Sequence, residues 1–273
     1  MSSRIGRIFS GLRASGRTGL VTYVTAGDPD ASRSAEILKV LDRAGADVLE
    51  VGVPFSDPLA DGPVIQRASE RALAGGATLA STLELIKGVR SDIQAAVVVF
   101  TYANPILRMG AETFAARAAD VGVDGVLVLD LPIEEAGPLR QTVVRAGIDP
   151  IFLLSPTTTD LRIQRAAELG KGFLYGISRL GVTGVRSDVA AGVNGLVQRI
   201  RAVTSLPVAV GFGLSHPDHL LEVGKCADAA VVGSALVDVI AREADSAGLV
   251  PAVASYVAWL KGDVEAMGGV GTP

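Results

Sequence analysis

Short apolar runs alternate with longer amphipathic stretches along most of the chain. Apolar runs without alternation predict strands buried on both faces, and the stretches between them predict helices, which together indicate a parallel sheet covered by helices. The predicted strands are Leu20–Thr25, Asp47–Val53, Ala95–Tyr102, Gly125–Leu129, Pro150–Leu154, Gly172–Ile177, Pro207–Gly211 and Ala229–Val232. The predicted helices lie near 32–44, 63–74, 79–91, 111–121, 134–146, 159–169, 189–203, 217–225, 234–245 and 249–266.

Repetition of this strand–helix unit predicts one α/β domain over 1–273, a (β/α)8 TIM barrel. Extra helices are expected at the N-terminus, after strand 2 and after strand 8. Segment 1–17 places arginines and apolar residues at helical spacing, which predicts a short amphipathic helix capping the core. A transit peptide is the alternative for that segment. A doubly wound open sheet is the alternative fold, but the turn TAGDPD (25–30) is not its dinucleotide fingerprint.

Composition narrows the classes of partner. A formal net charge of -4 does not favour a nucleic-acid groove or an anionic membrane surface. The apolar runs are too short to span a bilayer. Cys226 is the one cysteine, so no disulfide forms within the chain, and a reducing cytoplasm fits. With two histidines and no cysteine–histidine pattern, no metal site is expected.

Glu50 interrupts an otherwise apolar strand. In DVLEVGVP (47–54) the alternation of side chains places Glu50 on the face that points into the barrel. A buried carboxylate is costly unless it is paired or its pKa is raised. Because Glu50 lies near the C-terminal end of a barrel strand, its position favours the role of a catalytic acid/base. A salt bridge with an unidentified arginine or lysine is the alternative.

The loop PFSDPLADGP (54–63) follows that strand and is long for such a connection, as functional loops often are. Its Asp61 is either a second catalytic carboxylate or the N-cap of the next helix. Three glycine-rich loops, SRLGVTGVR (178–186), GFGLS (211–215) and VVGSAL (231–236), follow strands 6, 7 and 8. Glycine lets backbone amides approach an anion, so these loops predict a phosphate site.

The segment LEVGVPFSDPLADGP (49–63) matches the signature of tryptophan synthase alpha chains, which the whole chain resembles. TAGDP (25–29), YANP (102–105), ISRLGVTG (177–184), VGFGLS (210–215) and GSALV (233–237) resemble further family motifs in the right order. The resemblance implies a (β/α)8 lyase that cleaves indole-3-glycerol phosphate to indole and glyceraldehyde 3-phosphate. In that reaction Glu50 would serve as acid/base, and Asp61 would hold the indole N–H.

The resemblance also implies roles for other residues. The indole pocket would be lined by Tyr23, Phe100, Leu127, Leu129 and Leu153, with Tyr175 near the substrate and Thr183 on a lid. The phosphate would be bound by Gly184, Phe212, Gly213, Gly233 and Ser234. Tyr23 stands where other members often carry Phe, and Leu180 stands where Ser is common.

A beta subunit is the partner that the resemblance implies, in an alpha2beta2 heterotetramer. Pyridoxal phosphate (PLP) is expected only in the beta subunit, and no cofactor is expected in this chain. The partner surface would include Pro54, Ser56, Asp57, Pro58, Asn104 and Pro132.

Other functions remain as alternatives. A different phosphosugar enzyme is possible on this barrel, but indole-3-glycerol phosphate synthase would need catalytic lysines on strands, and none is found. A regulator that has lost activity would lack one of the two carboxylates. A purely structural barrel would leave Glu50 and the glycine-rich loops unexplained.

Overall fold

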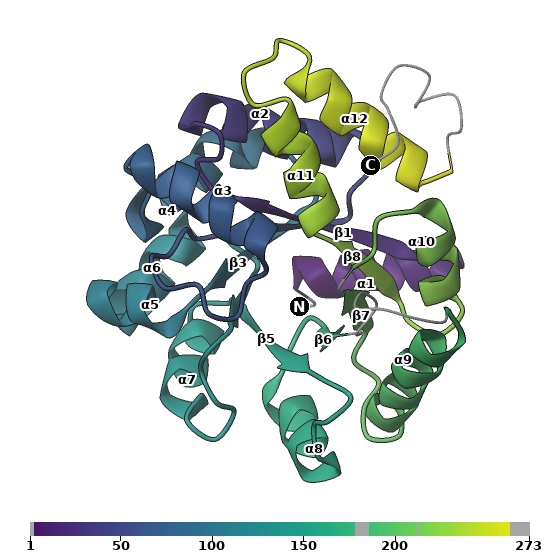
Figure 1. Cartoon of the computed structure of the whole chain (residues 1–273). Helices are drawn as coiled ribbons and strands as arrows, with labels where there is room; N and C mark the ends of the chain where they lie inside the picture. Colours follow the sequence, from purple (N-terminus) through teal and green to yellow (C-terminus); the bar gives the residue numbers. More distant parts are fainter. Residues whose placement is uncertain (1–2, 178–185, 212, 263–273) are drawn as a thin grey trace.

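The strands form a closed parallel barrel (Figure 1). The computed structural model describes residues 3–177, 186–211 and 213–262. Each strand pairs with the next in chain order, and the last pairs with the first. The strands are β1 (Gly19–Thr25), β2 (Val48–Gly52), β3 (Ala96–Thr101), β4 (Gly125–Val128), β5 (Asp149–Leu154), β6 (Leu174–Ile177), β7 (Val208–Gly211) and β8 (Ala229–Val232). The predicted barrel is confirmed, and the open sheet is excluded.

Helices surround the barrel in the described chain (Figure 1). They are α1 (Arg4–Ala14), α2 (Ala31–Arg43), α3 (Pro63–Ala74), α4 (Leu79–Val89), α5 (Ala103–Met109), α6 (Ala111–Asp120), α7 (Gly137–Arg145), α8 (Asp160–Leu169), α9 (Arg186–Arg201), α10 (Pro217–Gly224), α11 (Ser234–Arg242) and α12 (Leu249–Leu260), with a 3₁₀ turn, η1, at Arg90–Asp92. The expected extra helices are present. The sequence did not predict α5, whose Pro105 reads as a turn residue. Proline is tolerated there because the first turn of a helix does not use its amide.

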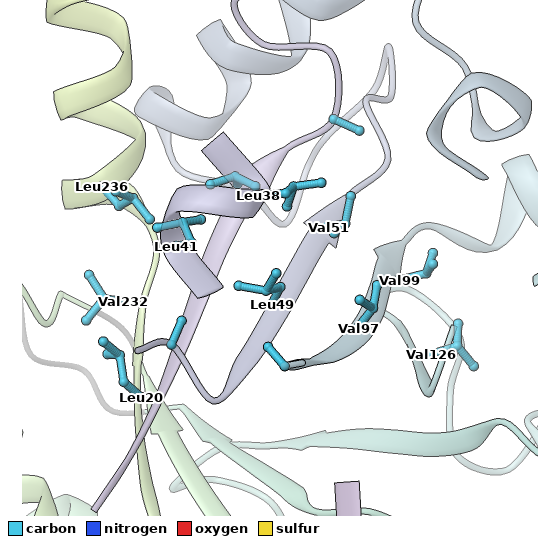
Figure 2. Packing of buried hydrophobic residues seen from close by; sticks show 14 of the residues in the cluster. Leu20, Leu38, Leu41, Leu49, Val51, Val97, Val99, Val126, Val232 and Leu236 are labelled. Atoms are coloured by element: carbon cyan, nitrogen blue, oxygen red, sulfur yellow. The ribbon is translucent and has the colours of Figure 1, made fainter. Parts of the chain in front are cut away.

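Outward-facing strand residues pack against the helices in the largest of three hydrophobic clusters. Figure 2 shows Leu49 and Val51 of β2 beside Leu38 and Leu41 of α2, and Leu236 belongs to the same cluster. All of β2 is buried. Because both faces of the strand are covered, its apolar run lacks the alternation of a strand that faces water.

Inward-facing residues form a second core with α1. Helix α1 packs its residues Ile5, Phe9 and Leu12 against inward-facing residues of the strands. The ring centroids of Phe9 and Phe173 lie 5.5 Å apart. A Cβ on Gly19, the first residue of β1, would lie only 2.7 Å from Leu12 Cδ1. The predicted amphipathic helix is therefore confirmed, and it closes the amino-terminal end of the barrel.

Three aspartates just before β2, β4 and β8 connect neighbouring strands and the N-terminal segment at the amino-terminal end of the barrel. Asp47, Asp124 and Asp228 each accept the backbone N–H of a residue in the preceding strand. Each also pairs with an arginine of the N-terminal segment: Arg17, Arg4 and Arg13, respectively. These contacts leave the opposite, carboxyl-terminal end for chemistry, as in other barrels of this kind.

Candidate active site

Glu50 points into the barrel from β2 and is 1% exposed. It pairs in register with Tyr23 on β1 and Val98 on β3. Within the described residues, the side chain of Glu50 makes no hydrogen bond or ion pair, and its Oε1 is buried without a partner. The salt-bridge alternative therefore finds no support there. Burial raises the pKa of Glu50 to about 8, because a charge in a dry site is poorly solvated. The carboxyl group is thus mostly protonated at neutral pH.

Asp61 lies in the loop between β2 and α3 and is half-buried. Helix α3 is preceded by Gly62 as N-cap, without a side-chain cap, so the interpretation of Asp61 as the cap is wrong. The Tyr102 hydroxyl instead donates a 3.0 Å hydrogen bond to Asp61 Oδ2. Burial raises the pKa of Asp61, and the Tyr102 hydrogen bond opposes that shift.

Aromatic and aliphatic side chains surround Glu50. Tyr23 and Phe100 meet edge to face at 5.1 Å. A Cβ on Gly52 would collide with the Tyr23 hydroxyl, and one on Gly211 would lie 2.5 Å from the Tyr175 hydroxyl. The two glycines therefore make room for the phenols. The other predicted pocket residues pack in the same interior cluster as Phe100 and Tyr175: Leu127, Leu129 and Leu153.

The predicted phosphate residues are described in part. Gly213 follows β7 and is exposed, with φ at +75°. Gly233 is the N-cap of α11, Ser234 is the first residue of that helix, and no side chain caps it. The first amides of α11 are thus left without intrahelical partners, an arrangement that favours anions. The remaining predicted residues of the lid and phosphate site lie outside the described residues: Leu180, Thr183, Gly184 and Phe212.

The predicted partner residues lie in the loop from β2, at the start of α5 and, for Pro132, in the loop after β4. Pro54 is buried and Pro58 is half-buried, while the other four are exposed: Ser56, Asp57, Asn104 and Pro132. Two leucines on this surface are exposed, Leu59 at 93% and Leu107 at 72%. Sequence reasoning missed Tyr102 as the partner of Asp61, although YANP (102–105) contains it.

Metal and membrane features are absent from the part of the chain that the structure describes. No group of three or more His, Cys, Asp or Glu side chains there could hold a metal ion. None of the described helices combines the length and apolar character needed to cross a bilayer.

Fold and site together define a (β/α)8-barrel enzyme equipped for acid–base chemistry. Comparisons with known proteins agree. The family model described as "Tryptophan synthase alpha chain" matches residues 9–258. The alpha chain of Solibacter usitatus is 46% identical over 259 residues, covering 95% of this chain and 97% of the relative. That of Caulobacter vibrioides is 51% identical over 238 residues, covering 87% and 86%.

Solved structures give the same result. The tryptophan synthase alpha subunit of Legionella pneumophila superposes with a TM-score of 0.88 at 33% identity, covering 95% of this chain and 97% of that one. A structure of tryptophan synthase from M. tuberculosis gives 0.86 at 34% identity, covering 95% and 98%. The chain belongs to the tryptophan synthase alpha chain family, a family of lyase-type enzyme subunits. The known role of this family is cleavage of indole-3-glycerol phosphate, so the prediction of that reaction is confirmed.

Proposed function

We propose that Glu50 and Asp61 are the two carboxylates that carry the cleavage of indole-3-glycerol phosphate. The observation on which this rests is the carboxyl of Glu50, which has no partner among the described residues and whose pKa burial raises to about 8. A general acid/base works best when its pKa lies near the working pH, because the group can then both give and take a proton.

The reaction requires one proton to be supplied and one to be removed. Protonated Glu50 gives its proton to indole C3, which makes the ring an electron sink. The resulting carboxylate accepts the proton of the adjacent glycerol hydroxyl as the C–C bond breaks. The bonding electron pair restores the aromatic indole, the hydroxyl carbon becomes the aldehyde, and Glu50 regains its proton.

Asp61 complements this cycle as an ionised carboxylate. Tyr102 holds Oδ2, and within the described residues no group donates a hydrogen bond to Oδ1. The free oxygen can accept the indole N–H and stabilise the positive charge that develops on the protonated ring. A protonated carboxyl and an ionised one in adjacent environments can then divide acid and electrostatic roles.

The substrate fits between the apolar interior and the uncapped start of α11. Tyr23, Phe100 and Tyr175 would contact the indole, together with Leu127, Leu129 and Leu153. Gly213, Gly233 and Ser234 would offer backbone amides to the phosphate. By the family resemblance, Gly184 and Phe212 would complete the phosphate site, and Thr183 would contact Asp61 from the lid.

The partner would be a beta subunit in an alpha2beta2 heterotetramer, with PLP bound by the beta subunit only. Exposed Leu59 and Leu107 support an apolar contact on the face that carries the loop from β2 and helix α5. Ser56, Asp57 and Asn104 would form polar parts of this interface, with Pro58 and Pro132 beside them. The whole chain would act as one domain in the cytoplasm.

The test is indole release from indole-3-glycerol phosphate by the purified chain, with and without a matched beta subunit. Release that rises with the partner, and is lost in both Glu50→Gln and Asp61→Asn, supports the proposal. Glu36→Gln, on the exposed side of α2, is a matched control that should keep the activity. Near-normal release by a folded Glu50→Gln protein would refute the assignment.

A further inference from the structure

Tyr102 joins three segments at the mouth of the barrel. It follows β3, is the N-cap residue of α5, and is 5% exposed. Its ring stacks on Phe55 at the start of the loop from β2, with centroids 4.9 Å apart. Its hydroxyl accepts the Ala60 N–H at 3.1 Å and donates to Asp61 at the end of that loop. One side chain therefore contacts both ends of the loop.

The backbone beside Tyr102 extends this connection. The N–H of Ala103 donates a 2.7 Å hydrogen bond to Asp130, just after β4. The segment at 102–103 thus contacts the loop from β2, begins the helix that carries Leu107, and holds the loop after β4. These are the same three segments that carry the proposed partner surface.

We propose that Tyr102 is a positioning residue: its hydroxyl fixes one Asp61 oxygen so that the other faces the substrate, and it links that carboxylate to the partner surface. This inference rests on the proposed catalytic role of Asp61. Geometry supports it, because the hydroxyl has its donor and acceptor capacity used by neighbouring residues of the same loop. A phenol held in this way cannot rotate freely, so the carboxylate it holds is fixed as well.

Electrostatics agree with that geometry. Burial and the Asp61 charge raise the pKa of Tyr102, which therefore stays neutral and keeps its proton for donation. The other titratable groups that act on this pair are Tyr23 from β1, near both Asp61 and Glu50, and Asp130, near Tyr102. Burial raises the pKa of Asp61, and the hydrogen bond from Tyr102 opposes that rise because it favours the charged form.

Tyr102→Phe is the decisive variant, because it keeps the ring and its stacking on Phe55 and removes only the hydroxyl. Loss of a hydrogen bond to a charged group predicts a fall in kcat of about 10-fold. KM should change by no more than about 2-fold, since the Asp61 charge interacts most strongly with the protonated ring, which forms only during the reaction. The acid limb of the pH–rate profile should move to higher pH, because Asp61 becomes easier to protonate.

Phe55→Leu is the matched control, because it removes the stacking partner and keeps the hydroxyl. Its acid limb should not move. An equal shift in this variant would show that loop packing sets the behaviour of Asp61, and would overturn the role of the hydroxyl.

A double-mutant cycle with Asp61→Asn separates this inference from the proposed function. If Tyr102 acts through Asp61, adding Tyr102→Phe to Asp61→Asn should cost less than about 2-fold. The positioning role alone would be overturned if the single variant Asp61→Asn is impaired while the single variant Tyr102→Phe matches the wild type in kcat and in the acid limb of its pH–rate profile. A fully active Asp61→Asn would instead overturn the assignment of Asp61, and the inference with it.

Discussion

Replacing Glu50 with glutamine should make the protein more stable while it abolishes cleavage. Glutamine has nearly the same shape as protonated glutamic acid and never ionises. The wild-type carboxyl lies in a site that provides no hydrogen bond from any described residue, so its ionised form is poorly tolerated in the folded state. The variant loses the proton that the reaction needs and also loses this penalty.

The size of the gain follows from the two pKa values of Glu50. The pKa is about 8 in the folded protein, against an ordinary glutamate value of 4.5. Between these values the folded state binds more protons than the unfolded state, so the wild-type free energy of unfolding falls as pH rises. The difference between the variant and the wild type should therefore grow by about 3 kcal/mol from about pH 5 to about pH 8. Above the folded-state pKa it should level off.

Urea unfolding of both proteins across this pH range measures the difference directly. The exposed variant Glu36→Gln is the control, and its difference from the wild type should stay nearly constant with pH. A Glu50→Gln difference that is also flat with pH would refute the reasoning, because it would mean that Glu50 ionises in the folded state as readily as in water. Cleavage assays on the same preparations would show whether Glu50→Gln loses activity while its free energy of unfolding rises.

Three further predictions concern the packing and pairing of buried side chains. Thr22→Val should raise the free energy of unfolding by about 1 kcal/mol in urea, because the Thr22 hydroxyl is buried without a hydrogen-bond partner among the described residues. Arg71→Met should lower it by about 3 kcal/mol by leaving Asp28 buried without the arginine that pairs with it through two hydrogen bonds. Adding Asp28→Asn should recover part of that loss, and no recovery would contradict the reasoning. Phe9→Ala should cost about 4 kcal/mol through the cavity it leaves at the closed end of the barrel; a loss below about 1 kcal/mol would mean that α1 contributes little.

The barrel and the position of Glu50 could be predicted because both depend on local periodicity. An apolar run fixes a buried strand, and a charged residue within it is conspicuous whatever the tertiary detail. The hydrogen bond between Tyr102 and Asp61 could not be predicted, because it joins residues 41 positions apart through the path of an irregular loop. The same loop path buries Pro54 and exposes Leu59, a difference that composition does not reveal.

Helix α5 was missed for a related reason. Its first turn contains Pro105, and a proline after a strand is as compatible with a turn as with a helix start. The choice between them depends on what the helix packs against, and Ile106 is its buried anchor. The structure was also needed to show that Glu50 has no ion-pair partner among the described residues, since the sequence alone allowed a salt bridge.

Helix α1 also determines which end of the barrel interior is open to other molecules. Phe9 and Leu12 fill the interior on the amino-terminal side of Glu50, where the aromatic ring of Phe173 adds to the seal. A molecule beside Glu50 would therefore meet packed apolar side chains on the amino-terminal side. Among the described residues, the interior beside Glu50 is therefore closed on the amino-terminal side, and a molecule bound there would enter and leave at the end of the barrel where Asp61 and Tyr102 lie.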